Sequence, residues 1–294
     1  EVARDLGLPP GVRVVTGTPD LHSAAIGSGA VADYEPHLAI STTSWISCHV
    51  PFKRTDAVHQ IATIPSLVRG RYLLANNHDT AGVCLQWLRD NVVAQDDGLL
   101  GPAPPEAGYA AYDALAARVP AGSDGVIFTP WLAGERCPVD DRNVRGGFYN
   151  LSLRTTRAHM VRSVFEGVAF NARWMLDAVE KFVRRPLGAI RFIGGGAASD
   201  VWCQIHADVL NRPVHRVAEP LLANVRGAAL FAGLVLGEVR QEEIAQLARV
   251  DATFEPQAAN RAVYEELYRE YPGLYHRQRK MYQRLNGRPA APRE

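Results

Sequence analysis

The sequence predicts an α/β fold, and three observations support this prediction. Short apolar runs typical of strands alternate along the chain with longer segments whose apolar residues recur at helical spacing. Residues 190–209 place a strand, three consecutive glycines and a helix in direct succession. The chain has 294 residues, of which 47% are hydrophobic and 21% charged, and this is enough for a substantial core of ordinary composition.

Composition argues against several classes of partner and site. The formal charge of +1 gives no overall attraction to nucleic acid or to an anionic membrane. The longest apolar run, residues 227–237, is shorter than the roughly 20 residues needed to cross a bilayer. The four cysteines lie far apart without a Cys-x-x-Cys pair, so we expect neither a structural zinc site nor a disulfide framework. A reducing, cytoplasmic setting fits best. The chain begins with Glu1 and shows no signal peptide, and we expect it to be part of a longer protein.

The first predicted elements are a short strand at 12–16 and a small-residue helix at 21–26. Thr18 is the expected N-cap of this helix and Pro19 its first residue. Asp20 has two interpretations. It can complement the helix dipole from the first turn, or it can act as a general base that faces a cleft from a strand end. Without further context, the first interpretation is favoured.

Residues 37–50 predict a β-hairpin whose turn is the hydroxyl-rich segment Ser41-Thr42-Thr43-Ser44. Residues with hydroxyl groups are common in turns, where they bind nearby backbone groups. They can also donate hydrogen bonds to phosphate oxygens. The next predicted elements are strands within 61–74, a helix at 80–93, a Pro- and Gly-rich loop at 98–108 and a short helix at 110–119.

A buried strand at 126–128 leads into a long, irregular and charged loop that extends to Phe148. Functional residues are often found on loops of this kind. Two interpretations of equal weight apply to the charged residues Glu135, Arg136 and Arg145. Glu135 can form a local ion pair with one of the arginines, or these residues can take part in ligand binding.

Residues 156–183 form the longest predicted helix, with one apolar face that belongs to the core. Gly167 in its middle predicts close packing against another backbone, because glycine costs about 1 kcal/mol relative to alanine there. The remaining predicted elements are a strand at 214–219, a small-residue helix at 227–236 and a last helix at 260–285 with a basic end.

The glycine-rich corner between the strand at 190–193 and the following helix is the main candidate site. Ser199 is the predicted N-cap of this helix. The absence of side chains at Gly194, Gly195 and Gly196 lets backbone N–H groups approach a ligand at the positive end of the helix dipole. The expected ligand is a phosphate or a nucleotide. A tight turn without a ligand is the alternative.

One form of nucleotide site is a dinucleotide-binding corner of a doubly wound sheet. Gly194-x-Gly196-x-x-Ser199 follows a strand and opens a helix, and Glu219 ends the next strand at the spacing expected for a ribose-binding acid. The match is weak because Ser199 replaces the third glycine. Too little chain follows to complete such a sheet.

Five blocks of sequence occur in a characteristic order and spacing. They are Phe128-x-Pro130-Trp131-Leu132-x-Gly134-Glu135-Arg136-x-Pro138, Arg145-Gly146-x-Phe148, Glu166-Gly167-Val168-Ala169-Phe170, Gly194-Gly195-Gly196-Ala197-x-Ser199-x-x-Trp202-x-Gln204-Ile205-x-Ala207-Asp208-Val209 and Gly227-Ala228-Ala229. Together they resemble the FGGY family of carbohydrate kinases, most closely the xylulokinases. The resemblance extends over most of the chain, from Gly17 to Leu236.

The resemblance implies an actin-like or hexokinase-like (ribonuclease H-like) ATPase fold, in which two α/β domains close over a cleft. This chain would be mainly the C-terminal half of such a two-domain kinase. Residues 1–29 would end the sugar-side domain, 30–275 would form the nucleotide-side domain, and 276–294 would be a basic tail.

The resemblance also implies the residues of the site. Those expected against the ADP part of ATP are Gly194, Gly195, Gly196 and Ala197. Those expected in the turn near the transferred phosphate are Thr42, Thr43 and Ser44, although the family has glycine at the positions of Thr42 and Trp45. Asp20 matches the aspartate of a Gly-x-x-Asp motif and would be the base that takes the proton of the sugar hydroxyl.

The implied function is ATP-dependent phosphorylation of a sugar hydroxyl, with a pentulose such as D-xylulose as the expected substrate. Mg²⁺ would arrive with the nucleotide, and no metal site made by protein side chains alone is expected. The chain alone is expected to be inactive because the family's first half is missing. The alternatives are a kinase for another polyol or sugar acid, and a non-catalytic relative with a binding or regulatory role. The expected partners are the sugar and ATP, with neither nucleic acid nor membrane; a homodimer is left open.

Overall fold

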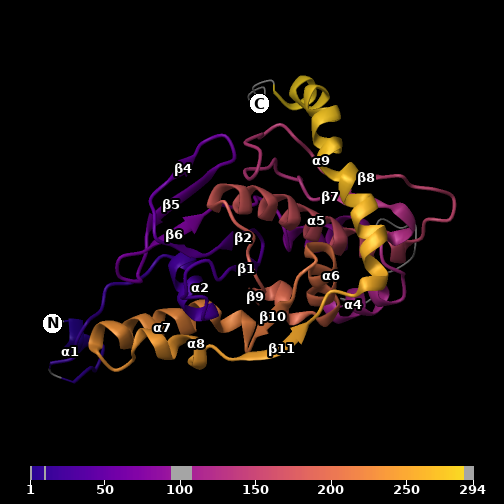
Figure 1. Cartoon of the computed structure of the whole chain (residues 1–294). Coiled ribbons are helices and arrows are strands. Elements are labelled where there is room, and N and C mark those ends of the chain that lie inside the picture. The colour runs from indigo at the N-terminus through magenta and orange to yellow at the C-terminus, as the bar shows by residue number, and fades with distance from the viewer. Residues whose placement is uncertain (1, 10, 94–107, 288–294) are drawn as a thin grey trace, which may run out of the picture.

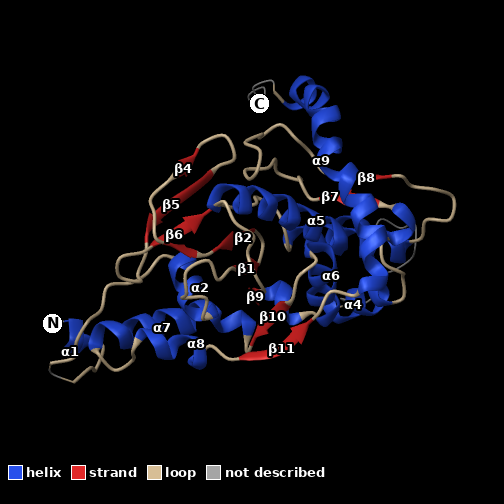
Figure 2. Cartoon of the chain, viewed as in Figure 1, coloured by secondary structure: helices blue, strands red, loops and turns tan. Residues whose placement is uncertain are grey.

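A five-stranded sheet forms the centre of the structure, a computed structural model that describes residues 2–9, 11–93 and 108–287 (Figures 1 and 2). The strands are ordered β11-β10-β9-β1-β2. They are β1 (His37–Ile40), β2 (Ser44–Ser47), β9 (Ile190–Ile193), β10 (Val214–Val217) and β11 (Val250–Phe254). The three central strands are parallel to one another, whereas β2 and β11 run antiparallel to their neighbours.

This sheet confirms the α/β class and contradicts the doubly wound alternative. A dinucleotide-binding sheet continues through further parallel strands connected by helices. In the described residues, antiparallel strands close the five-stranded sheet on both sides of its parallel centre. Glu219, the ribose-binding candidate of that alternative, is exposed and lies beyond the end of β10.

Helices cover both faces of the sheet. The α-helices of the described residues are α1 (Val2–Asp5), α2 (Asp20–Ser28), α3 (Val83–Leu88), α4 (Tyr109–Ala117), α5 (Arg157–Val183), α6 (Asp200–Leu210), α7 (Ala223–Leu236), α8 (Ile244–Leu247) and α9 (Ala258–Asn286). Alternate residues of β1 point to opposite faces. Leu38 and Ile40 join the large core that contains α5 and α6, whereas Ala39 joins a smaller cluster with α2 and α7.

Two smaller sheets complete the strand content of the described residues. The order β3-β6-β5-β4 forms an antiparallel sheet of β3 (His49–Val50), β4 (Thr55–Asp56), β5 (Ile61–Pro65) and β6 (Tyr72–Ala75). The hairpin of β7 (Ile127–Thr129) and β8 (Gly147–Tyr149) lies against α5. The predicted hairpin at 37–50 is confirmed as the antiparallel pair of β1 and β2, and the chain then passes into β3 of the second sheet.

The predicted helix at 156–183 is confirmed as α5. Thr156 is its N-cap and forms a capping box with His159. The predicted close approach at Gly167 is also confirmed, because a Cβ atom there would lie only 2.2 Å from the carbonyl oxygen of Phe128 in β7. The prediction that this helix is the longest is wrong: α5 has 27 residues, and α9 continues past both predicted ends to reach 29.

The helices α2 and α7 cross at very short distance, and two glycines allow it. A Cβ atom at Gly27 would lie 1.8 Å from the carbonyl oxygen of Ala223, and one at Gly227 would lie 1.8 Å from that of Ser23. Each glycine therefore packs against the backbone of the other helix. The tight packing predicted from the small residues of the helix at 227–236 is confirmed.

Two predictions near the N-terminus are wrong. Residues 12–16 form no strand, and the Val14 side chain is 90% exposed, because no described strand lies beside them to pair with. Thr18 does not cap α2; Pro19 occupies the N-cap position, and the Thr18 hydroxyl instead hydrogen-bonds to that of Ser23.

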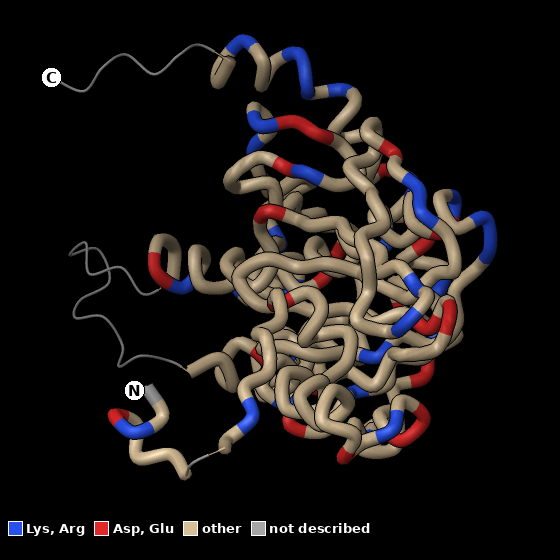
Figure 3. The backbone as a smooth tube through the Cα atoms, turned by 90° about the vertical axis from the view of Figure 1, so that its left-hand side faces the viewer, with Lys and Arg blue, Asp and Glu red and all other residues tan. Residues whose placement is uncertain are grey.

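Most of the predicted loop at 98–108 lies outside the described residues. The proposed division into 1–29, 30–275 and 276–294 stays a prediction, and α9 crosses its last boundary without a break. All four cysteines are buried and unpaired. Within the described ranges no helix is long and apolar enough to span a bilayer. Charges of both signs are interspersed along the chain, with basic residues along the last turns of α9 (Figure 3).

Candidate functional site

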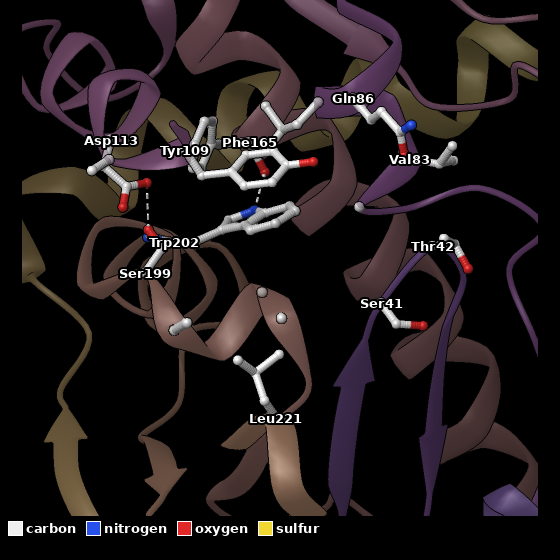
Figure 4. A pocket seen from close by; sticks show the side chains of 16 residues that line it. Ser41, Thr42, Val83, Gln86, Tyr109, Asp113, Phe165, Ser199, Trp202 and Leu221 are labelled. Carbon is white, nitrogen blue, oxygen red and sulfur yellow. Dashed lines mark hydrogen bonds between the residues drawn. The ribbon is translucent and has the colours of Figure 1, made fainter. Parts of the chain in front are cut away.

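The glycine-rich corner lines a pocket of about 490 Å³ (Figure 4). The corner itself contributes Gly195, Gly196, Ala198 and Ser199, and the β1–β2 turn contributes Ser41 and Thr42. The other lining residues are Gly82, Val83, Leu85, Gln86, Tyr109, Ala110, Asp113, Phe165, Trp202 and Leu221. A pocket of this size is in the range that holds a cofactor or another small molecule.

The three glycines of the corner have different neighbours. Gly194 has φ +86°, and a Cβ atom there would lie 2.4 Å from the carbonyl oxygen of Ile40. A Cβ atom at Gly196 would lie 2.8 Å from the Cβ of Ile40. At Gly195, by contrast, the nearest atom would be Cδ2 of Leu221 at 3.8 Å. Gly194 and Gly196 are therefore required by the packing of β1, whereas Gly195 leaves free space on the pocket side.

Two backbone donors of the corner are available to a ligand. Residues 195–198 form one short 3-10 turn between β9 and α6. Among the hydrogen bonds of the described residues, none uses the N–H of Gly195 or Gly196. Because unpaired N–H groups near a helix N-terminus attract anions, this arrangement is suited to phosphate oxygens.

The side chains at the start of α6 are held in place by hydrogen bonds. Ser199 caps the helix as predicted, since its Oγ accepts from the backbone N–H of Trp202 at 3.0 Å. The same hydroxyl donates to Asp113 of α4 at 2.7 Å, and burial raises the pKa of Asp113 (Figure 4). The Trp202 indole N–H donates to the carbonyl of Phe165 at 3.0 Å. This end of the pocket thus presents a fixed indole and the Tyr109 ring, which can contact the flat face of a base.

The β1–β2 turn contributes Ser41 and Thr42 to the lining of the pocket (Figure 4). Their carbonyls accept hydrogen bonds from Gly82 and Ala81 at the start of α3, which fixes the turn. Thr43 is half-buried and does not line the pocket.

Ser44 and Trp45, which follow in β2, face other parts of the structure. Ser44 is fully buried, and its Oγ lies 2.8 Å from Nδ1 of His78. Trp45 packs on the cluster that contains Ala39, so its bulk lies outside the pocket.

The structure does not bring every predicted site residue to this pocket. Gly194 and Ala197 are absent from the lining, and Ala197 is fully buried. Asp20 is exposed in the first turn of α2, and its carboxylate accepts a hydrogen bond from the N–H of Leu21 at 2.7 Å. It does not line the pocket. However, α2 packs across α7, which begins two residues after Leu221, so this contact fixes α2 relative to the pocket.

The ion pair considered for Glu135 is not present in the described structure. Arg136 pairs instead with Asp79, at 3.0 Å, while Glu135 accepts hydrogen bonds from its own neighbour's N–H at 2.8 Å and from the Asn171 amide at 2.6 Å. Burial raises the pKa of Glu135 to about 8. Glu135 is 0% exposed, and its hydrogen bond with Asn171 holds the loop against α5.

Several lining residues have no signal in the sequence. Tyr109 and Asp113 lie in a helix whose sequence looks ordinary, and only the packing of α4 beside α6 brings them to the corner. Gln86 reaches the pocket from α3 in the same way. Trp202 reaches the pocket from the first turn of α6. In the described ranges, no group of three or more His, Cys, Asp or Glu side chains is placed to hold a metal ion.

Comparisons with known proteins find a family description and several relatives that match most of this chain. The description "FGGY family of carbohydrate kinases, C-terminal domain" matches residues 43–236. A xylulose kinase of Staphylococcus epidermidis is 31% identical over 280 residues, which are 93% of this chain and 53% of that protein. A gluconokinase of Bacillus subtilis is 29% identical over 81% of this chain and 46% of its own length. A glycerol kinase of Synechocystis is 36% identical over 71% of this chain and 37% of its own length.

A solved structure shows the same fold. The crystal structure of ligand-bound xylulose kinase from Lactobacillus acidophilus superimposes with a TM-score of 0.84 at 26% identity, covering 96% of this chain and 55% of that one. The predicted actin-like, ribonuclease H-like ATPase fold is thereby confirmed. The chain spans about half the length of the curated relatives it matches. With more than half of its residues matched by the family's C-terminal domain, the chain belongs to the FGGY family of carbohydrate kinases.

Proposed function

We propose that this chain is the nucleotide-binding part of a kinase that transfers the terminal phosphate of ATP to a sugar hydroxyl, with a pentulose such as D-xylulose as the substrate. The observation that carries the proposal is the pocket at the corner, where the unpaired N–H groups of Gly195 and Gly196 lie within one cavity with the Trp202 indole. Membership of a carbohydrate kinase family supports it. The proposed setting is the cytoplasm.

The pocket suggests an orientation for the nucleotide. The base would lie at the end formed by Tyr109 and Trp202, where aromatic faces are available. The phosphates would extend toward Gly195 and the hydroxyls of Ser41 and Thr42, where donors are available. This donor set fits a phosphate chain. A nucleotide-bound Mg²⁺ draws most of its ligands from phosphate and water, and it would neutralise charge during transfer.

Asp20 is the proposed base that orients the sugar hydroxyl and accepts its proton. Its carboxylate is exposed at the start of α2 and forms no ion pair with any described residue. An exposed carboxylate of this kind can accept a hydrogen bond from a substrate hydroxyl. The sugar and the rest of the cleft would be supplied by the longer protein, and we propose that this chain alone transfers no phosphate.

Two alternatives stay open. The similarity to gluconokinase and glycerol kinase keeps a sugar acid or another polyol as the substrate. A non-catalytic relative with a binding or regulatory role is the alternative from another class, favoured by the departure from the family pattern at Thr42, which lines the pocket. A protein that binds ATP but phosphorylates no pentulose, sugar acid or polyol would be such a non-catalytic relative.

The proposal is tested with the Asp20→Ala variant of the longer protein. Phosphorylation should fall by about 100-fold or more, because general base catalysis contributes about that factor, while the affinity for ATP should stay unchanged. Turnover is measured against D-xylulose, gluconate and glycerol, and ATP binding by calorimetry. Full activity of the variant would remove Asp20 from the mechanism. Loss of ATP binding together with activity would show that the substitution acts on the fold and not on the proton.

A further inference from the structure

A second pocket, of about 560 Å³, lies between α5 and α9 and shares no lining residue with the nucleotide pocket. Four segments that are distant in sequence form it: the turn between β4 and β5, the loop before β8, the C-terminal half of α5 and the middle of α9. Its lining residues are Val58, His59, Pro138, Val139, Asp140, Trp174, Asp177, Ala178, Lys181, Tyr268, Pro272, Tyr275, His276 and Arg279. The proposed kinase reaction does not use any of them.

The aromatic lining of this pocket is fixed by contacts behind it. The rings of Trp174 and Tyr275 lie 5.8 Å apart, and Trp174 meets Tyr271 edge-on at 6.2 Å. The phenol of Tyr275 donates to the carboxylate of Asp141 at 3.2 Å, and that of Tyr268 donates to Asp177. Because these rings are held in place, they offer a preformed apolar surface to the carbon part of a ligand.

The rim carries two exposed cations that come from different helices, Lys181 of α5 and Arg279 of α9. Neither forms an ion pair with any described residue. Two lining carboxylates oppose them. Asp177 already accepts the hydrogen bond from Tyr268, whereas Asp140 is exposed. Two cations that line one pocket, neither of them paired with a carboxylate, are suited to an anion with several acceptor oxygens.

We propose that this pocket binds a small organic phosphate, with the phosphate group between Lys181 and Arg279 and the carbon part against Trp174. A phosphate ester can accept from both cations at once, and its negative charge offsets theirs. The aromatic surface adds contact area that a free phosphate ion cannot use. The pocket would thus be a ligand site that is separate from the nucleotide site.

The experiment is calorimetric titration of the protein with phenyl phosphate, which combines a phosphate with a planar apolar group. The Lys181→Ala/Arg279→Ala variant should weaken binding by roughly tenfold or more, because hydrogen bonds to charged groups are lost. Lys280→Ala is the matched control, since Lys280 is exposed on α9 outside the pocket, and it should bind as the wild type does. Asp140→Asn should tighten binding, because it removes a like charge. Inorganic phosphate should bind more weakly than the ester.

Each opposite result would overturn the proposal. Absence of binding by the wild type, or equal binding by the double variant, would remove the site. Tighter binding by the double variant together with weaker binding by Asp140→Asn would show that the pocket prefers a cation. A titration in saturating ADP, repeated with Gly195→Val, separates this pocket from the nucleotide site. If either condition abolishes binding, phenyl phosphate occupies the nucleotide pocket and the second site does not exist.

Discussion

At Gly195 a side chain would enter the pocket, whereas at Gly194 and Gly196 it would strike the residue Ile40 of β1. Three neighbouring residues of one type therefore meet different physical requirements. The family resemblance implies that all three lie against the ADP part of ATP. In the structure, two are needed to seat the corner on the sheet, and only Gly195 leaves space that a phosphate could use.

Substitution of Gly195 by valine separates binding from folding. The branched side chain would fill the approach to the free N–H groups, so the affinity for ADP should fall by about tenfold or more, as expected for the loss of hydrogen bonds to a charged group. The fold should persist, because the nearest atom to a Cβ there is 3.8 Å away. Calorimetry measures the affinity and circular dichroism the fold. Gly195→Ala, which adds one methyl group, is the control, and its affinity for ADP should fall by less than that of the valine variant. An unchanged affinity of the valine variant would contradict this role.

His206 of α6 makes the stability of the protein depend on pH. Burial lowers the pKa of His206 to about 4, and its Nδ1 lies 2.8 Å from the carbonyl oxygen of Trp202. Between pH 6.5 and 4 the unfolded chain takes up a proton that the folded chain does not, so the free energy of unfolding falls as the pH falls. The contribution is fully present above pH 6.5.

The variant His206→Gln should lose less stability on acidification. Between pH 7 and pH 5 the wild type should lose about 2 kcal/mol more than the variant, at about 1.4 kcal/mol for each pH unit below the unfolded pKa. Urea unfolding at the two pH values measures this double difference. The buried His37 and His78 are present in both proteins, so their contributions cancel in this double difference. Equal losses in the two proteins would show that His206 is already protonated or accessible in the folded state.

At the scale of elements, the crossing of α2 and α7 has no room for a side chain. Gly227→Ala would place a methyl group 1.8 Å from the carbonyl oxygen of Ser23, and backbone on both helices would have to move. We expect a loss of about 3 kcal/mol in the free energy of unfolding, the upper part of the range for overpacking. Ala228→Ser, at an exposed position of the same helix, is the control and should change stability by less than about 0.5 kcal/mol. Equal urea midpoints for the two variants would contradict this packing.

At the scale of the whole molecule, the nucleotide pocket draws together parts of the chain that are far apart. The β1–β2 turn, α3, α4, α5 and the corner before α6 all contribute lining residues. A ligand that contacts them together binds only the folded chain. It should therefore stabilise the entire structure and not one loop.

ADP should raise the free energy of unfolding by about 2.7 kcal/mol at a free concentration of 100 times its Kd. At the same concentration, Gly195→Val should gain only about 1.4 kcal/mol if its affinity is tenfold lower. Chemical unfolding with and without ADP measures both values. If ADP leaves the free energy of unfolding of the wild type unchanged, the folded chain does not bind the nucleotide.

Four features could be predicted from the sequence: the α/β class, the strand–glycine–helix corner, the hairpin of β1 and β2, and the close approach at Gly167. These features depend on local signals: periodicity, capping residues and glycines, which act over a few neighbouring residues. The strand expected at 12–16 failed because a strand also needs a partner, and pairing is not a local property.

The set of residues that meet at the pocket depends on how distant parts of the chain pack together. Tyr109, Asp113 and Gln86 reach it because α3 and α4 pack beside the corner, whereas Ala197 turns into the core although it adjoins the glycines. Contacts between distant segments depend on how whole helices and sheets pack, and no short stretch of sequence records that. The sequence thus located the corner, while the packing of separate elements around it selected the side chains that face a ligand.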